Sequence, residues 1–521
     1  MDRKAVRTIG FMMAVTLVSK LLGLAREVFL AGYYGAGLEA AAFSTAVDIP
    51  LKFFDLAFGA AVTSTFIPVF NKYLKNDDDS GGFLFASRFI NLIFILTTAL
   101  AVAGMLFSDQ LIALFLPGGS LQVRELASHL LVILFPTAIL AGLTFSMISI
   151  LQSMRHFTIP AMISLFPNLI TIGYLIFLNK RYGITGLAFA FLLSWALQAL
   201  IQLPFIRKKG FVYTPSISLK DPGIRNVSKM ALPILVSSWV QPVSLFMLGA
   251  FASFAGNESV AAIKYANRLY LILAGIFVFA MMNYLFPLMS RQADDAITED
   301  YKNTYRRAFE NLCFFILPLA LAAFLLSPAL ISIVYERGAF NEAASGLTSN
   351  AFAGFSLAIF GFSLYEITSK AYYATRSVIA PTIASLIALA VTFALSAAAV
   401  FWLDLGIGYI SLSFSIGITT AAITLVFMFN KKMNGLLEGR SIGELLRSLL
   451  SALFMGVVIY FIKVMAIDTA AREFWPRLSL TMVAVLSGAI VYLISMALLK
   501  SPTFAYYYKW AALKIKGGTD G

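Results

Sequence analysis

Long apolar runs separated by short polar clusters dominate the chain. A helix of about 20 apolar residues crosses a bilayer core of roughly 30 Å. Dividing the chain at its polar clusters and at Gly/Pro punctuation predicts an all-α polytopic membrane protein with about fourteen transmembrane helices. The predicted spans are residues 8–32, 40–71, 88–109, 125–153, 158–178, 184–206, 228–255, 258–290, 308–334, 346–375, 379–403, 407–430, 444–466 and 478–499.

The composition agrees with this class of protein and limits the kinds of chemical site that the chain can contain. Hydrophobic residues make up 60% of the chain and charged residues 12%, about half the charged fraction of a soluble domain. Cys313 is the single cysteine, so the chain has no intrachain disulfide. His129 and His156 lie far apart and outside any cluster of Cys or carboxylate residues. We therefore expect neither a metal site of ordinary spacing nor a cofactor.

The placement of the basic residues predicts the orientation in the membrane. The net charge is +13, and 27 of the 39 Lys and Arg residues fall at the two ends of the chain or in every second loop and the span ends beside it. The opposite loops, with the span ends beside them, hold only seven, and five lie in the interior of spans. The positive-inside rule then predicts that both termini are cytoplasmic. The excess of basic residues thus reflects the topology and an attraction to anionic lipid headgroups. We do not expect nucleic-acid binding.

An internal duplication divides the chain. Four short segments recur in the same order about 220 residues further on, which predicts two homologous six-helix lobes. The four pairs are residues 17–34 and 235–251, 65–72 and 284–291, 155–165 and 376–386, and 183–191 and 406–414. The predicted parts are lobes 1–210 and 226–432, two additional helices in 443–500 and a cytoplasmic tail, 501–521. Transporters commonly bind their substrate between such repeats.

Three predicted spans carry ionisable residues in their interior. These are Lys20, Arg26 and Glu27 in span 8–32, Asp48, Lys52 and Asp55 in span 40–71, and Lys264 and Arg268 in span 258–290. An ionised side chain at mid-bilayer costs at least about 2.5–3.5 kcal/mol, so such residues normally face a bundle interior or a wet cavity. The duplication superposes the first two spans on spans 228–255 and 258–290. We therefore expect these charges to line a cleft between the lobes.

The charge balance of this cleft favours an anionic substrate. Five cations stand against four acids, Glu366 included, and Arg recognises phosphate through its bidentate fork. In the alternative interpretation, these charged residues have a structural role and do not bind substrate. Lys52, near the helix irregularity expected at Pro50, would then snorkel towards the interface. Glu366 would in any case pair with Lys370 one turn away.

Several segments together resemble a known family. They are LVSKLLGLAREVFLAGYYGAG at 17–37, IPLKFF at 49–54, FIPVF at 66–70, RHFTIPA at 155–161 and YANRL at 265–269. The chain resembles the MurJ (MviN) family of lipid II flippases, within the multidrug/oligosaccharidyl-lipid/polysaccharide exporter superfamily. The resemblance runs in order from residue 7 to about residue 500 and includes the pattern formed by Ser19, Gly23 and Arg26.

The resemblance implies a fold and a site. The fold is a V-shaped bundle of two six-helix lobes around a cationic cavity, with spans 444–466 and 478–499 forming a groove for the polyprenyl tail. Arg26 and Arg268 match family arginines associated with the substrate pyrophosphate, and Lys20 stands where many members have arginine. Glu27 occupies a position that is often aspartate.

This chain also departs from the family pattern. Phe54 stands where the family has an arginine, Ala41 where it has a carboxylate and Gly59 where it has a glutamate. Lys52 or Lys264 could supply the missing positive charge. The acidic groups that some members use to bind a cation are not evident, so we do not expect a specific sodium site.

These observations predict a lipid II flippase of the bacterial cytoplasmic membrane that works by alternating access and is not an enzyme. The chain has no GxxxxGK[ST] motif for nucleotide binding, so the energy must come from the membrane potential, an ion gradient or consumption of the product. Expected partners are lipid II, membrane lipids and cell-wall synthesis proteins. The alternatives are a flippase for another undecaprenyl-pyrophosphate-linked oligosaccharide, a drug/cation antiporter and a non-transporting scaffold.

Overall fold

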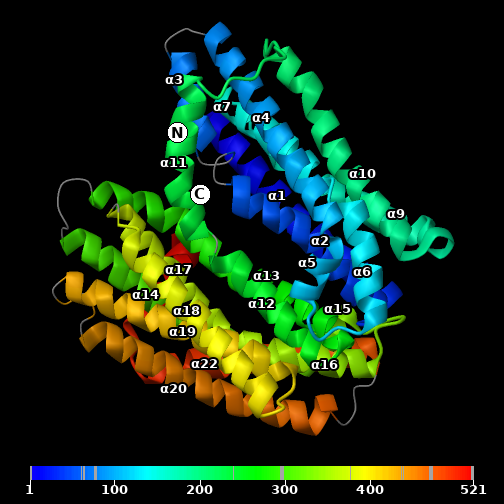
Figure 1. Cartoon of the computed structure of the whole chain (residues 1–521). Coiled ribbons are helices and arrows are strands. Elements are labelled where there is room, and N and C mark those ends of the chain that lie inside the picture. The colour runs from blue at the N-terminus through cyan, green and yellow to red at the C-terminus, as the bar shows by residue number, and fades with distance from the viewer. Residues whose placement is uncertain are drawn as a thin grey trace. The chain divides into compact units, whose positions relative to one another are not determined.

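The structure is a computed structural model. It describes residues 3–59, 62, 65–75, 79–238, 240–293, 299–375, 377–433, 435, 437, 439–468 and 473–517. Every regular element in these ranges is a helix, which confirms the predicted fold class. The chain forms two compact units. Their helices are labelled in Figure 1. Unit 1 is Met1–Ala261 with Arg337–Phe340, and unit 2 is Ala262–Glu336 with Asn341–Gly521. The lobe boundaries drawn from the duplication stay a prediction.

Unit 1 contains the first twelve α-helices and a π-helical turn, η1. Its elements are α1 (Arg3–Tyr34), α2 (Leu38–Phe54), η1 (Asp55–Gly59), α3 (Phe66–Lys75), α4 (Asp79–Leu106), α5 (Ser108–Phe115), α6 (Leu121–Leu134), α7 (Thr137–Ser153), α8 (Thr158–Met162), α9 (Leu165–Phe177), α10 (Asn179–Lys208), α11 (Pro222–Ser238) and α12 (Val240–Phe254). Within it α2 packs against α6, α1 against α9, and α10 against both α7 and α9.

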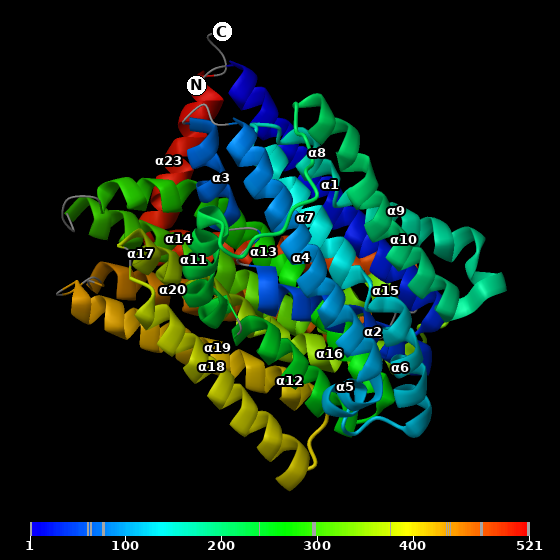
Figure 2. The same cartoon turned by 45° about the horizontal axis from the view of Figure 1, so that its top comes forward.

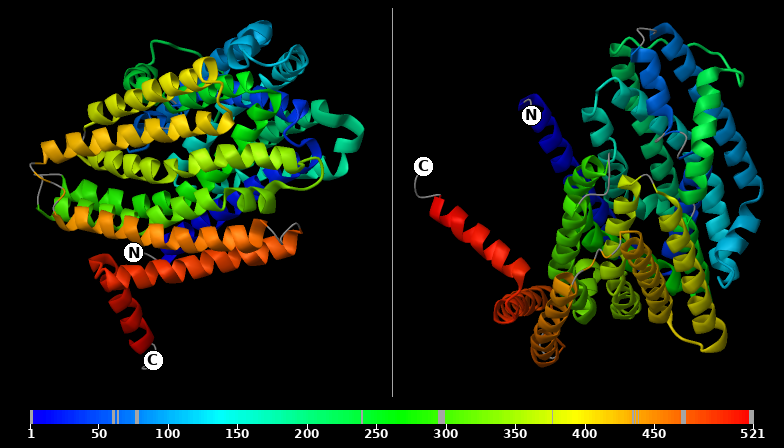
Figure 3. Two further views of the ribbon diagram at one scale, coloured as in Figure 1. Left: turned by 90° about the horizontal axis from the view of Figure 1, so that it is seen from below. Right: turned by 90° about the vertical axis from the view of Figure 1, so that its left-hand side faces the viewer.

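Helix α13 (Asn257–Gln292) begins in unit 1 and continues into unit 2. The other elements of unit 2 are α14 (Glu299–Leu325), α15 (Ser327–Tyr335), α16 (Glu342–Ser356), α17 (Ala358–Ala374), α18 (Ile379–Ala397), η3 (Ala398–Trp402), α19 (Ile407–Lys432), α20 (Gly439–Ile462), η4 (Lys463–Ile467), α22 (Phe474–Leu498) and α23 (Pro502–Gly517). Helix α19 packs against α16, α17 and α18, and α20 packs between α14 and α22. Figure 3 shows α20 and α22 side by side, with α23 leaving at an angle.

The predicted spans coincide with helices. Nine helical segments among the described residues are long and apolar enough to cross a membrane, and the pair α6–α7, bent by 40°, adds a tenth. The four other predicted spans, 8–32, 40–71, 228–255 and 258–290, are helical wherever they are described, apart from the last residue of 228–255. Parts of 40–71 and 228–255, and the last four residues of the predicted tail, lie outside the described residues. The helices are therefore compatible with fourteen crossings.

The order and length of the helices repeat along the chain. Helices α4, α5, α6 and α7 have 28, 8, 14 and 17 residues, and α14, α15, α16 and α17 have 27, 9, 15 and 17. Each helix of the second series begins about 220 residues after its counterpart, the offset found between the repeated sequence segments. The duplication predicted from the sequence is thus confirmed at the level of helices.

Two connections related by this duplication dock onto helix junctions in unit 1. The α5–α6 connection contacts the α12–α13 junction, where Gly118 N donates to Ser253 Oγ at 2.9 Å and Ser120 N donates to Asn257 Oδ1 at 3.0 Å. The α15–α16 connection contacts the end of α1, where Ala339 N donates to Gly32 O at 2.8 Å. In the duplication the α12–α13 junction corresponds to the α1–α2 junction. The two contacts are therefore reciprocal between the repeats.

Glycines make this close approach possible. A Cβ at Gly338 would lie 2.3 Å from Gly32 O, and a Cβ at Gly35 would lie 2.6 Å from Ala339 O. Both glycines have positive φ (+59°), a region that costs other residues roughly 1–2 kcal/mol. At the contact made by the α5–α6 connection, a Cβ on Gly118 would lie 2.6 Å from the backbone of Phe254. At each position the neighbouring atom is backbone, which a side-chain rotation cannot move.

A hydrogen bond from the penultimate helix α22 compensates for a defect in α14. Pro318 lies within α14 and has no N–H, so it cannot donate to the carbonyl of Phe314 four residues earlier. The buried Tyr492 of α22 donates its hydroxyl to Phe314 O at 2.7 Å instead. The additional C-terminal helices are thus joined to the second repeat by a polar contact that the break in α14 makes available.

Tyr492→Phe should destabilise unit 2 by about 1–3 kcal/mol, because it leaves the buried Phe314 carbonyl unsatisfied. Thermal unfolding of the purified chain measures this, with Tyr460→Phe, at an exposed site on α20, as the matched control. Adding Pro318→Ala supplies an N–H to the same carbonyl and should shrink the cost of Tyr492→Phe. An equal cost of Tyr492→Phe with and without Pro318→Ala would contradict this account.

Candidate substrate-binding site

Helix α1 is fixed along its middle by polar contacts with Ser164, between α8 and α9, and with Asn168 of α9. Ser19 Oγ donates to Ser164 O at 3.2 Å, and Asn168 Nδ2 donates to Ser19 O at 3.3 Å and to Ser164 O at 3.1 Å. Gly23, one turn further along α1, is buried. Arg26 follows Ser19 by seven residues and so lies two turns along the same side of the helix. These contacts set the rotation of α1 about its axis and hence the direction of its charges.

The charges of α1 include a close ion pair. Arg26 Nη2 lies 2.6 Å from Glu27 Oε1, and the side chains are only 20% and 16% exposed. Lys20 is half-buried on the same helix and also interacts with neighbouring groups. Glu27, seven residues after Lys20, is paired in the structure with its neighbour Arg26. The pair keeps both ions partly compensated where water is scarce.

The charges of α2 stand next to a change in helix type. Asp48 and Lys52 are half-buried on either side of Pro50, and the helix runs through this proline. At Asp55 the α-helix gives way to the π-helical turn η1, a feature frequent at functional sites. Lys52 attracts the Asp55 carboxylate. The irregularity expected near Pro50 thus occurs one turn later, at the third charged residue of this span.

Two positions where the chain departs from the pattern of the family it resembles have clear surroundings. Phe54 is buried and stacks on Phe145 of α7, with ring centroids 5.8 Å apart and planes at 12°. It therefore belongs to the packing of unit 1. At Gly59 a Cβ would lie 3.4 Å from Asp55 Oδ1, so a larger side chain here would press on that carboxylate.

The remaining candidate cations lie on α13 in unit 2. Lys264 is half-buried and interacts with neighbouring groups, whereas Arg268 is exposed. The residue next to Lys264 is held by α15, because Tyr335 donates its hydroxyl to Tyr265 O and the two rings lie 5.3 Å apart. Lys264 and Arg268, one turn apart, share a face of α13.

The structure therefore places six of the eight candidate residues on α1, α2 and η1 of unit 1 and two on α13. Their joint action in one cavity stays a prediction. Asn168 was not among the residues predicted from the sequence, although an amide in an otherwise apolar span was a visible signal. Two buried acids of unit 2 were not predicted either. Ser441 donates to Glu310 at 3.0 Å, and Ser501 donates to the fully buried Glu444. Both acids join helices to one another.

Comparison with known proteins places the chain in a family. The family model "Lipid II flippase MurJ" matches residues 30–498, about nine-tenths of the chain. The chain belongs to the lipid II flippase MurJ family. Curated relatives named "Probable lipid II flippase MurJ" include a Rhizobium tropici protein, 29% identical over 73% of each chain. An Aquifex aeolicus protein of the same name is 25% identical over 85% of this chain and 86% of its own.

Solved structures agree with this membership. A lipid II flippase MurJ in an inward closed conformation is 25% identical and superposes with a TM-score of 0.78, over 94% of this chain and 98% of its own. A multidrug resistance MATE family transporter in an inward-facing conformation superposes with a TM-score of 0.69 at 17% identity, over 82% and 98%. The second likeness shows the fold alone. The chain is thus a multi-span membrane protein with a transporter fold.

Proposed function

We propose that this MurJ family member translocates lipid II across the bacterial cytoplasmic membrane by alternating access. The observation that carries the proposal is the set of cations on membrane-embedded helices. Such residues are costly to insert and normally mark a substrate path. They are Lys20, Arg26, Lys52, Lys264 and Arg268. The names of the relatives, lipid II flippases, give the substrate that this chemistry fits.

In the proposed mechanism the cations hold the pyrophosphate of the lipid while the sugar and peptide occupy a wet cavity. Arg26 and Arg268 contribute guanidinium groups suited to bidentate phosphate contacts. Glu27, Asp48 and Asp55 balance the cations when substrate is absent, and the pairing of Glu27 with Arg26 supports this role. Arrival of the pyrophosphate then exchanges one anionic partner of Arg26 for another, so the buried charge is never left uncompensated.

The polyprenyl tail stays in lipid, along a groove formed by the two additional helices, α20 and α22. Many of their apolar side chains are exposed, including Leu453, Phe461 and Leu486. Both termini lie in the cytoplasm by the placement of basic residues. The chain acts as a transporter with no catalytic residue, and cell-wall synthesis proteins are the partners expected to supply and consume its substrate.

Complementation tests the proposal. A bacterium depleted of its own lipid II flippase should grow when this chain is expressed and should lyse with an empty vector. Membrane levels of the chain are measured in parallel, so that poor expression is recognised. A chain present at normal levels that fails to restore growth would argue for another undecaprenyl-pyrophosphate-linked oligosaccharide. Growth restored in a strain lacking an exopolysaccharide flippase would then support that alternative directly.

A further inference from the structure

An apolar groove runs along α9 and α10, and none of its lining residues is a candidate cation. Its volume is about 720 Å³, within the range of ligand-binding pockets. The side chains that define it include Tyr174, Leu178, Tyr182, Phe189, Leu193 and Ala196. Phe189 and Leu193 are more than half exposed. In Figure 2 the two helices lie side by side and project together from unit 1.

The groove is built by a fixed tyrosine and a glycine. Tyr174 is buried and donates its hydroxyl to Gly183 O at 2.7 Å, so its polar atom is satisfied. A Cβ at Gly186 would lie 2.2 Å from that hydroxyl. Only glycine therefore allows the ring to lie in this position. This wall of the groove is held by these contacts and does not depend on a ligand.

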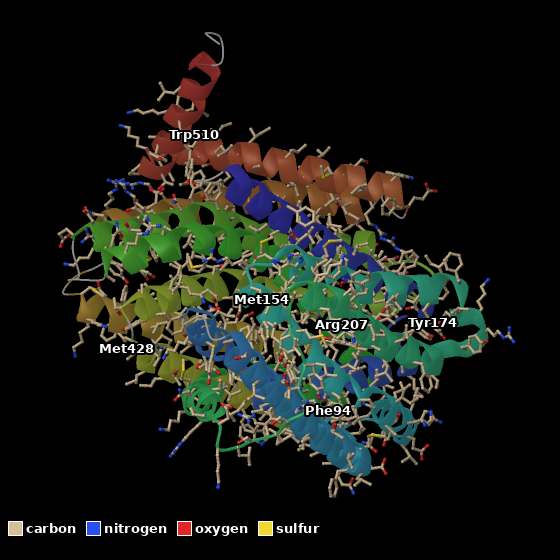
Figure 4. All side chains as sticks on the ribbon, turned by 90° about the horizontal axis from the view of Figure 1, so that it is seen from above. Phe94, Met154, Tyr174, Arg207, Met428 and Trp510 are labelled. Carbon is tan, nitrogen blue, oxygen red and sulfur yellow. The ribbon has the colours of Figure 1, made fainter. Side chains whose placement is uncertain are left out.

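The groove has the length of a lipid chain. Helix α10 is kinked at Gly183, and from Ile184 to Ala196 it rises about 18 Å, while one leaflet contributes roughly 15 Å of hydrocarbon. Figure 4 labels Tyr174 and Arg207, which mark opposite ends of the α9–α10 pair. By the predicted topology the Tyr174 end faces the outside of the cell. The groove thus starts at the outer headgroup level and reaches past the middle of the membrane.

Two cations stand at the outer end of the groove. Lys180 and Arg181 are exposed and lie in sequence between the lining residues Leu178 and Tyr182. The guanidinium of Arg181 lies 5.4 Å from the centre of the Tyr182 ring, which holds it against the groove wall. Only seven basic residues are predicted on this side of the membrane, and these two are adjacent. A pair of cations here runs against the general charge distribution of the chain.

We propose that this groove binds one anionic phospholipid of the outer leaflet. An acyl chain lies along α10 from Tyr182 towards Ala196, and the headgroup phosphate contacts Lys180 and Arg181. The apolar lining matches the chain, and the two cations match the phosphate. This lipid site is distinct from the proposed lipid II cavity. It depends on the predicted orientation of the chain and not on the transported substrate.

Native mass spectrometry of the full chain, titrated in detergent with phosphatidylglycerol or phosphatidylcholine, tests the proposal. The wild type should bind one phosphatidylglycerol preferentially. A variant with Lys180→Gln and Arg181→Gln should bind it about 25-fold more weakly, since each basic side chain near an anionic headgroup contributes roughly fivefold. The matched control, Lys208→Gln with Lys209→Gln, removes the same charge from the other end of α10 and should bind like the wild type.

The apolar part of the site has its own variant. Ala196→Phe fills the inner end of the groove and should weaken binding, whereas Leu200→Phe, one turn further on an exposed position, should not. An unchanged thermal unfolding midpoint shows that each variant is folded. Equal binding of phosphatidylglycerol by the wild type and the Lys180/Arg181 variant would overturn the proposal. So would equal binding of phosphatidylcholine and phosphatidylglycerol by the wild type.

Discussion

Arg26→Ala should abolish rescue of the flippase-depleted bacterium while the protein remains in the membrane at its normal level. Two effects combine at this position. The variant loses a guanidinium proposed to hold the pyrophosphate, and it leaves Glu27 half-buried without its ion-pair partner. Breaking a well-buried pair costs about 3–5 kcal/mol, and the partial exposure of this pair reduces that figure. The variant should therefore be folded, although less stable than the wild type.

Two further variants separate the binding role from the structural one. Arg26→Ala combined with Glu27→Ala removes both charges and restores stability towards that of the wild type. Arg26→Glu combined with Glu27→Arg keeps the ion pair but moves the guanidinium about 100° around α1. If Arg26 binds substrate, neither double variant should support growth. Growth with the exchanged pair would show that the pair is only structural. Growth at wild-type rates with all three variants would refute the assignment of Arg26 to the substrate-binding site.

Gly338→Ala should open the contact between the α15–α16 connection and the end of α1. The added Cβ would lie 2.3 Å from Gly32 O, and the positive φ of Gly338 adds about 1–2 kcal/mol of strain for alanine. The contact must then separate and lose the Ala339–Gly32 hydrogen bond. We expect a loss of more than about 2 kcal/mol in the free energy of unfolding. The thermal unfolding midpoint should fall accordingly.

The matched control for this prediction lies eight residues away. A Cβ at Gly346, within α16, meets nothing within 4 Å, so Gly346→Ala should leave the midpoint unchanged or raise it slightly. Gly118→Ala alters the reciprocal contact and should resemble Gly338→Ala. Equal midpoints for Gly338→Ala and Gly346→Ala would refute the steric argument.

Gly338→Ala also tests whether the contact between the α15–α16 connection and the end of α1 takes part in alternating access. By the predicted topology both docked connections lie on the outside of the cell, so they must separate for the substrate to leave. Ala36 lies in the α1–α2 connection and is nearly fully buried, and the native Cys313 is buried as well. An Ala36→Cys reporter should therefore react slowly with a water-soluble thiol reagent and faster when Gly338→Ala is added. An unchanged rate would show that the contact does not seal this face.

The helices and their repetition could be predicted from the amino-acid sequence. Spans such as 379–403 and 407–430 coincide with α18–η3 and α19 within a few residues, because hydropathy is a local property that a bilayer-spanning helix must satisfy along its whole length. The duplication was equally visible, since related segments keep their spacing. The charged residues within spans could be found because each is an exception to an otherwise apolar run.

Which groups meet depends on how the helices pack. Asn168 of α9, for example, donates its side-chain amide to the backbone of Ser19 in the middle of α1. Phe54 packs on Phe145, a residue of another helix that no local pattern could indicate. The bond from Tyr492 to Phe314, like the docking of Ala339 on Gly32, joins residues far apart in the chain. Periodicity fixes which side of a helix is apolar, whereas the partner of each side chain depends on how helices distant in sequence pack together.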